Sequence, residues 1–240
     1  MKIIDAHWEL RNLGLVTQEV EIEESDNIEE IEDSIDSLQA EYQVVKVSSE
    51  RLDVYKILSE KGFFFVESLI RVSHGLNNIS CSKLIMRISD QIGYDEMSPK
   101  EIDFMEQQIR DGMFRTDRVT LDSFFNKAQS SNRYVMWMKD ELNNGSVLYN
   151  YKYKEQPIGF SCFKETEYQK YYPVLGGVYN TGKALPFGSA IIYKQLEIAK
   201  NLGGKELYTY ISSNNQAVVR AYSQLGYSFD DMKYVFVKHA

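Results

Sequence analysis

Two strand patterns alternate with two helix patterns late in the chain. In order, these patterns cover residues 174–179, 189–202, 206–211 and 215–225. Each helix pattern stops at a glycine, the first at Gly203 and the second at Gly226, because glycine readily takes the left-handed conformation that ends a helix. Strands that alternate with helices in this way are typical of a mixed α/β fold, in which helices cover the faces of a sheet.

The first 75 residues predict a smaller unit that is also α/β. Its strand patterns cover residues 16–22, 42–47 and 63–72. Between the first two strands, apolar residues recur at helical spacing along one stripe, and these are Ile28, Ile31, Ile35 and Leu38. Ten carboxylates and no basic residue lie between Glu19 and Asp36, and we interpret them as a solvated helix face.

The distribution of charge supports a division into two domains. Residues 1–75 contain 7 Lys and Arg against 17 Asp and Glu, whereas the rest of the chain contains 20 against 18. The polar, glycine-bearing stretch 74–80 lies at this change and is the best linker candidate. We therefore expect a small acidic α/β domain over residues 1–75 and a larger domain over residues 83–240.

The larger domain is expected to begin with a short strand. Before residue 174, the predicted elements of this domain are a strand at 83–88, helices at 99–110 and 121–142, and strands at 147–154 and 157–163. A last strand is predicted at 233–238. Tyr149, Tyr151 and Tyr153 alternate along one of these strands, and we interpret them as packing residues at one face rather than as a platform for nucleic-acid bases. Cys162 lies on an apolar strand and is expected to be a buried small hydrophobic residue.

The composition excludes several classes of protein. The chain has 240 residues, of which 43% are hydrophobic, and no apolar run approaches the roughly 20 residues that span a bilayer. We expect a soluble, cytoplasmic protein without a membrane segment or secretory leader. The 2 cysteines and 3 histidines have no metal-ligand spacing and cannot form a disulfide framework. A net charge of −8 disfavours general binding to nucleic acid.

The loop over residues 180–189 joins a strand to the start of a helix. Its small residues, among them Gly182 and Gly188, lead into a helix N-terminus, where unpaired N–H groups and the positive end of the helix dipole favour an anion. The loop matches neither the dinucleotide-binding motif nor the nucleoside-triphosphate loop. Taken alone, it is equally consistent with an ordinary strand-to-helix turn.

The residues after the second strand resemble the C-terminal motif of the GNAT acetyltransferase superfamily, and the similarity extends over about residues 83–240. The motif consists of an Asn, a small residue three positions on, a Tyr seven positions on, and then a Gly and an aromatic residue. Its places are taken by Asn215, Val218, Tyr222, Gly226 and Tyr227.

The preceding loop is similar to the acetyl-CoA pyrophosphate arm of that superfamily. The arm has Gln or Arg first, Gly fourth, and Gly or Ala sixth, and residues 183–188 occupy these places. Two positions depart from the pattern, because Lys183 replaces Gln or Arg, and Pro186 replaces the first Gly and has no N–H. The final Gly188 matches.

The resemblance implies a GNAT fold, in which a mixed central sheet has two splayed strands and flanking helices, here preceded by the small α/β domain. It also implies acetyl-CoA as a co-substrate and no metal. The residues that it places against acetyl-CoA are Val178, Tyr179, Lys183, Ala184, Leu185, Phe187, Gly188, Ser189 and Asn215.

In that superfamily an amine attacks the thioester directly, without a covalent enzyme intermediate. The resemblance implies that the Val178 N–H stabilises the oxyanion and that Tyr222, as the catalytic residue, hydrogen-bonds the leaving thiolate. No sequence feature selects the base that deprotonates the amine. Asp117, Glu165 and Glu167 are candidates, and each is also typical of a surface carboxylate.

A finer resemblance covers nearly the whole chain and points to nucleotide-amino-sugar N-acetyltransferases of the dTDP-fucosamine acetyltransferase type. The similar positions are Trp8-Glu9, Gly14, residues 44–72, Phe114-Arg115, Arg133-Tyr134 and Trp137. Such an acceptor implies that Arg115 and Arg118 bind its diphosphate, and a homodimer is expected at the family level. The alternatives are a GNAT enzyme for another small amine or antibiotic, and a GNAT-fold protein that binds a ligand or partner without catalysis.

Overall fold

In the computed structural model, which describes residues 1–180 and 187–240, ten strands from these ranges pair in one mixed sheet. The order across the sheet is β1-β2-β3-β10-β4-β9-β8-β7-β6-β5. The strands are β1 (Lys2–Asp5), β2 (Thr17–Ile22), β3 (Tyr42–Ser48), β4 (Phe64–Gly75), β5 (Ile92–Glu96), β6 (Val147–Tyr153), β7 (Gln156–Glu167), β8 (Lys170–Val178), β9 (Glu206–Ser212) and β10 (Ser228–His239).

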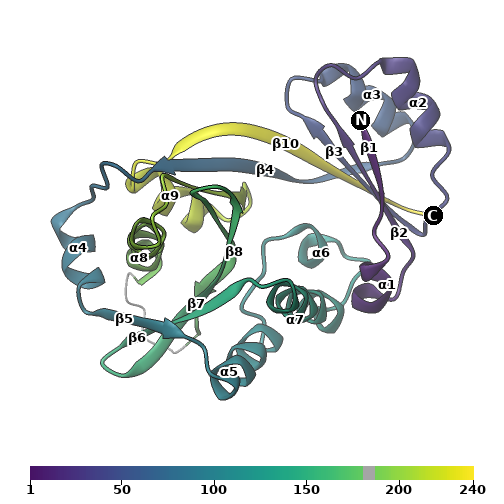
Figure 1. The fold of residues 1–240 in the computed structure, drawn as a ribbon. Helices are drawn as coiled ribbons and strands as arrows, with labels where there is room; N and C mark the ends of the chain where they lie inside the picture. Colours follow the sequence, from purple (N-terminus) through teal and green to yellow (C-terminus); the bar gives the residue numbers. More distant parts are fainter. Residues whose placement is uncertain (181–186) are drawn as a thin grey trace.

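Helices lie on both faces of this sheet (Figure 1). Those that the structure describes are α1 (Trp8–Leu13), α2 (Ile28–Asp36), α3 (Leu52–Glu60), α4 (Lys83–Ser89), α5 (Pro99–Arg110), α6 (Arg118–Leu121), α7 (Lys127–Asn143), α8 (Phe187–Asn201) and α9 (Gln216–Gln224). None of them, within the described ranges, is long and apolar enough to cross a membrane.

Two long strands in the middle of the sheet, β4 and β10, join the two halves of the chain. Each is 12 residues long, and they pair antiparallel from Ser73 opposite Ser228 to Phe64 opposite Val237. On its other edge β10 pairs with β3, and β4 pairs with β9. Figure 1 shows the pair running from the α2–α3 region to the α8–α9 region. Residues from the first 75 positions therefore share one sheet with the larger region, and the two-domain division itself stays a prediction.

The N-terminal half of the sheet has a core on each face. On one face, α2 and α3 pack their apolar stripes onto β2, β3 and β10, and the predicted stripe residues Ile31 and Ile35 are buried there. On the other face, Leu13 of α1 and Val119 of α6 pack with β3 and β10. The acidic residues of α2 are largely exposed, as the amphipathic pattern predicts.

The second half of the sheet is also covered on both faces. Helices α8 and α9 pack on β9 and on β6 to β8 from one side, with α4 against α8. Helices α5 and α7 pack on β6, β7 and β8 from the other side. Tyr151 and Cys162 are fully buried in these two cores, which confirms their predicted packing role. Burial raises the pKa of the Cys162 thiol to about 12, so this thiol is not a nucleophile at neutral pH.

Most of the predicted elements are confirmed, and the clearest error lies at residues 83–88. These residues form helix α4 rather than a strand, because the Ser82 side chain accepts a hydrogen bond from the Ile85 N–H (3.3 Å) and caps a helix. The predicted helix over 121–142 begins later, at Lys127, where Asn126 and Gln129 form a capping box. Strands β1 and β5 and helix α1 were not predicted from the sequence.

Strands β8 and β9 are neighbours in the sheet but pair only at their first residues. Their parallel register joins Lys170 to Glu206 and Tyr171 to Leu207, and no later pair joins the described residues of these strands. Just beyond these pairs, the Thr209 hydroxyl donates a hydrogen bond to the Pro173 carbonyl (3.0 Å). From that point the strands diverge, which confirms the splayed strands expected from the sequence.

Candidate active site

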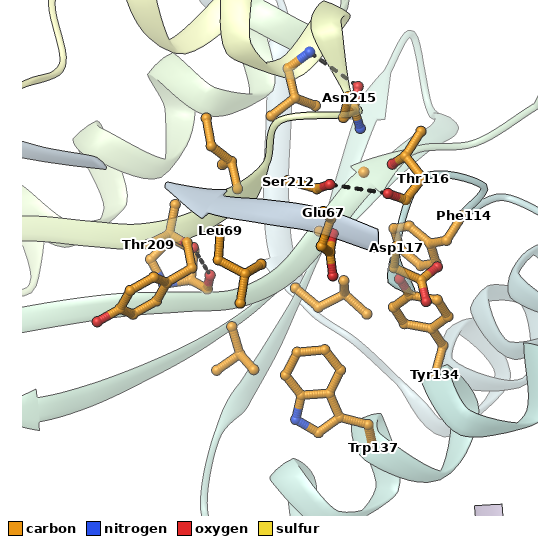
Figure 2. A pocket seen from close by; sticks show the side chains of 18 of the residues that line it. Glu67, Leu69, Phe114, Thr116, Asp117, Tyr134, Trp137, Thr209, Ser212 and Asn215 are labelled. Carbon is orange, nitrogen blue, oxygen red and sulfur yellow. Dashed lines mark hydrogen bonds between the residues drawn. The ribbon is translucent and has the colours of Figure 1, made fainter. Parts of the chain in front are cut away.

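The gap between β8 and β9 opens into a cavity of about 690 Å³. One end is lined by the start of α8 and by α9, and the other end by side chains of α1, β2, β3, α6 and α7. The middle is formed by β4 together with the diverging parts of β8 and β9 (Figure 2). The cavity thus runs through the sheet gap and draws its walls from both halves of the chain.

The edge of β8 that faces the gap carries unpaired backbone groups. The Tyr179 N–H donates to the Ile158 carbonyl (2.9 Å), so Tyr179 belongs to the set of residues that bond to β7. Residues of an antiparallel ladder alternate between bonding to the partner and facing away from it. Val178 and Gly176 therefore direct their N–H and C=O groups toward β9, and both residues line the cavity.

Glycines bring β7 and β8 unusually close at this wall. A Cβ atom on Gly159 would lie 2.4 Å from the Gly177 carbonyl oxygen, and one on Gly176 would lie 2.8 Å from the Phe160 carbonyl oxygen. Because these neighbours are backbone atoms, a side chain at either position would displace β8. The glycines therefore fix the position of the strand that carries the unpaired amides.

Helix α8 begins at the same end of the cavity. Gly188 in its first turn lines the cavity, whereas Phe187 is buried against the Tyr153 ring and Ser189 does not line it. Within the described residues α8 begins at Phe187, and the first N–H groups of a helix have no partner within the helix. The expected acetyl-CoA residues Lys183, Ala184 and Leu185, together with the departure at Pro186, lie outside the described residues.

Helix α9 supplies the expected catalytic tyrosine. Asn215 caps α9 by accepting a hydrogen bond from the Val218 N–H (3.2 Å), and this cap sets the first turn of the helix at the cavity. Two turns on, Tyr222 lines the cavity with its ring edge-on to Tyr227, at a centroid distance of 4.7 Å. Burial raises the pKa of the Tyr222 hydroxyl, which therefore stays protonated at neutral pH.

Tyr179 and Val178 have different surroundings although they are adjacent. The Tyr179 ring is buried between Phe104 and Phe160, away from the residues that line the cavity, and its N–H is bonded to Ile158. Val178 lines the cavity. Of the two, Val178 is therefore the one whose backbone faces the gap.

Gln195 of α8 lines the cavity and is not singled out by any sequence motif. Its side chain is buried, and its Oε1 atom has no hydrogen-bond partner among the described residues. A buried amide oxygen without a partner is costly. Gln195 is therefore a candidate contact for a polar group of a ligand near Tyr222 and Ile191.

Glu67 of β4 is the carboxylate most clearly directed into the cavity (Figure 2). It is only 4% exposed. Its Oε1 accepts a hydrogen bond from the Arg118 N–H (3.1 Å), while its Oε2 has no partner among residues 1–180 and 187–240. Burial raises the pKa of Glu67, and the neighbouring Ser212 hydroxyl and Arg118 charge oppose this rise only in part. Sequence reasoning missed Glu67.

The three carboxylates considered from sequence are placed differently. Asp117 lines the cavity, but its oxygens cap α6 by accepting from the Val119 and Thr120 N–H groups (3.0 and 3.3 Å) and from the Thr120 hydroxyl (2.6 Å). Glu165 and Glu167 lie at the far end of β7 and do not line the cavity. Glu67 is thus the better placed candidate for a base.

Arg118 and Arg115, expected to bind an acceptor diphosphate, are not brought together. Arg118 lines the cavity but is buried, and it forms ion pairs with Glu19 and, at 3.5 Å, with Glu9. Its Nε has no hydrogen-bond acceptor among the described residues. Arg115 donates from Nε to the Gly112 carbonyl (2.8 Å) and lines a separate cavity beside the start of α7.

The other cations at the far end of the cavity are also paired. Glu9, which is fully buried, accepts a hydrogen bond from Arg133 Nε (2.7 Å). Lys46 contacts Glu19 at 2.7 Å and Glu21 at 3.5 Å. This network of ion pairs joins α1, β2, β3, α6 and α7. Burial alone would raise the pKa of Glu19, but the charges of Arg118 and Lys46 outweigh this effect and hold the pKa well below its usual range.

No cluster of three or more His, Cys, Asp or Glu side chains suited to a metal ion is found in the part of the chain that the structure describes.

The chain matches no protein-family model and no curated protein. Among solved structures it is similar to a conserved protein of unknown function from Staphylococcus epidermidis, with a TM-score of 0.64 and 12% identity over 96% of this chain and 88% of that one. It is also similar to a GCN5-related N-acetyltransferase from Sphaerobacter thermophilus, with a TM-score of 0.58 and 13% identity over 88% of this chain and 64% of that one.

A third similar structure is a GCN5-related N-acetyltransferase from Kribbella flavida, with a TM-score of 0.53 and 10% identity over 88% of this chain and 72% of that one. Identities this low establish the fold alone. The mixed α/β architecture of the GNAT type that the sequence predicts is therefore confirmed. The finer resemblance to the dTDP-fucosamine type finds no support in these neighbours.

Proposed function

We propose that this protein is an N-acyltransferase that moves an acetyl group from acetyl-CoA to a small amine. The observation that carries the proposal is the divergence of β8 and β9 around a cavity. A thioester needs a slot whose wall offers hydrogen-bond donors to its carbonyl, and the gap between these strands provides such a wall.

Three features of the described residues fit an acetyl-CoA donor. The unpaired edge of β8 at Gly176 and Val178 suits the amide groups of a pantetheine arm. The start of α8 at Gly188 suits a pyrophosphate, because helix N-termini favour anions. Asn215 and Tyr222 of α9 line the opposite side of the same space.

The proposed reaction is a direct attack. The neutral amine nitrogen bonds to the thioester carbonyl carbon, and the carbonyl oxygen becomes an oxyanion. The C–O double bond then re-forms as the C–S bond breaks, and the proton that the nitrogen loses passes, directly or through solvent, to the departing sulfur, so that the products are an amide and the CoA thiol. The Val178 N–H is assigned to the oxyanion. Tyr222 is assigned to the leaving sulfur as a hydrogen-bond donor, and its raised pKa favours donation of a hydrogen bond over full loss of its proton.

The nucleotide-linked amino sugar expected from the finer resemblance remains one acceptor hypothesis, but the geometry favours a wider class of amines. A diphosphate needs cationic groups that are free to bind it. Arg118 is neutralised by Glu19 and Glu9, and Arg115 lies in another cavity. An anionic acceptor would therefore have to displace buried ion pairs.

Two measurements test the proposal. Titration calorimetry with acetyl-CoA should give binding, and the release of free CoA thiol should depend on an added amine. A panel that contains a dTDP-4-amino-4,6-dideoxyhexose, an aminoglycoside antibiotic and simple alkylamines distinguishes the acceptors. Absence of acetyl-CoA binding would favour the alternative of a non-catalytic protein with this fold.

A further inference from the structure

Two carboxylates that line the cavity, Glu67 and Asp117, have no cationic partner among the described residues, but the Asp117 oxygens are satisfied by the first turn of α6. Four Lys and Arg side chains in the described residues line the cavity, and each has a carboxylate partner: Lys46 with Glu19, Arg118 with Glu19, Arg133 with Glu9, and Lys233 with Glu23. Glu67 has no cationic side chain in ion-pair contact within the described ranges. A buried carboxylate without a partner is unfavourable unless a ligand supplies the missing positive charge.

Aromatic side chains lie around this carboxylate. Trp137 and Tyr134 of α7 are stacked at a centroid distance of 6.3 Å, and Phe114 packs on Tyr134 at 4.5 Å. All three line the cavity, and Figure 2 shows them on the α7 side of the space into which Glu67 points. Aromatic faces attract organic cations as well as apolar groups. Leu69 and Leu175, which also line the cavity, are apolar.

We propose that this end of the cavity binds the ammonium group of a small, singly charged amine with an apolar body, with Glu67 Oε2 as its partner and Trp137 and Tyr134 against its carbon skeleton. The inference rests on the proposed function and names its acceptor class. Glu67 then accepts one proton from the ammonium, which leaves a neutral amine free to attack the thioester and a protonated carboxyl on β4.

The same charges exclude other acceptors. A substrate with a carboxylate or phosphate next to its amine would place a second anion beside Glu67 and Asp117, where each nearby cation is already paired. A neutral molecule of the same shape would leave Glu67 without a counter-charge. The cavity therefore discriminates by charge as well as by shape.

Titration calorimetry on the full-length protein tests the inference with three probes of one shape. Benzylamine carries the ammonium, benzyl alcohol is neutral, and phenylglycine adds a carboxylate next to the amine. Each is titrated with and without saturating CoA, so that the result does not depend on turnover. We expect benzylamine to bind at least tenfold more tightly than either of the other two.

Variants locate the interaction. Glu67→Gln keeps the Oε1 acceptor for the Arg118 N–H and removes the charge, and it should weaken benzylamine binding by tenfold or more. Trp137→Leu should weaken it by roughly 2- to 30-fold through loss of the cation–π contact. Glu206→Gln is the matched control, because Glu206 lies on the neighbouring strand β9, pairs with Arg71 and does not line the cavity.

Three results would overturn the inference: no binding of benzylamine, equal binding of benzyl alcohol, or undiminished binding by Glu67→Gln. The proposed function fails separately, through absence of acetyl-CoA binding in the wild-type protein. Loss of amine binding in Glu67→Gln with unchanged acetyl-CoA binding would support the acceptor assignment and exclude unfolding of the variant.

Discussion

Replacing Glu67 by glutamine should make the protein more stable at neutral pH although it removes a functional group. In the folded protein, burial raises the pKa of Glu67 above its value in the unfolded chain, and Oε2 has no partner within the described residues. The unfolded chain therefore loses this proton at a lower pH than the folded protein does. Stability falls as the pH rises from the unfolded pKa through the folded pKa, and the loss persists above that window.

Glutamine does not titrate, so the variant escapes this loss. An unsatisfied buried group costs about 1–3 kcal/mol, and more when it is charged, so the neutral amide should be favoured over the carboxylate by on the order of 1–3 kcal/mol. For a chain of this size, 1 kcal/mol corresponds to roughly 2–4 °C in Tm. We therefore expect Glu67→Gln to melt about 2–12 °C higher at pH 8. Three other groups face Glu67, namely Arg118, Asp117 and Ser212. Arg118 and Asp117 are held by their own partners, and Ser212 carries no charge. None of them should therefore turn the expected rise in Tm into a fall.

Thermal melts of both proteins between pH 4.5 and 8 measure the effect. The difference in Tm should be largest at pH 8 and should shrink as the pH falls, because the wild-type carboxyl is then protonated in both states. Glu206→Gln, which removes an ion-paired and partly exposed carboxylate, should not be stabilised at any pH. A Glu67→Gln variant no more stable than wild type at pH 8, or a difference that grows on acidification, would refute the reasoning.

Three further outcomes follow from the structure. Tyr222→Phe should lower kcat by a factor of roughly 10²–10⁴ and leave the affinity for acetyl-CoA in calorimetry unchanged, because only the hydroxyl is lost. A kcat equal to that of the wild-type protein would mean that another group stabilises the leaving thiolate. Gly159→Ala should destabilise the protein to urea by about 1–3 kcal/mol, since the new Cβ meets the Gly177 carbonyl at 2.4 Å. Gly188→Ala is the control, because, apart from the adjoining residues of its own helix, no atom of residues 1–180 and 187–240 lies within 4 Å of its new Cβ. Glu9→Gln should cost about 3–5 kcal/mol in the same assay, because Glu9 is fully buried and its charge is paired with the half-buried Arg133 and with the buried Arg118. A cost below about 1 kcal/mol would contradict a structural role for these pairs.

The sequence could predict that Val178, Gly188, Asn215 and Tyr222 meet at one place because they are close together in the chain, and their role toward an acyl donor stays a prediction. The strand, loop and helix that precede Gly203, and the Asn215–Tyr222 spacing on the next helix, are local patterns. Local patterns of this kind fix which backbone groups face a ligand. The splayed strands were expected from the resemblance that this motif carries.

The acceptor end could not be predicted because its contacts are distant in sequence. Glu67 lies on a strand expected in the first domain, and only its pairing with β9 and β10 brings it beside Ser212 and Arg118. Arg118 was expected to bind a diphosphate, but it is paired with Glu19, about 100 positions earlier in the chain. The error at residues 83–88 has a different origin, since a short apolar run is compatible with either a strand or a helix.

The position of β10 also determines when this protein can fold during synthesis. Strands β3 and β4 are made early, yet both lie against β10, which comes from residues 228–239. Until those residues leave the ribosome, each strand has an open edge that a neighbouring nascent chain could pair with. Closure of the sheet is therefore a late, long-range event, and shielding of these edges by a chaperone should raise the yield of the recombinant protein.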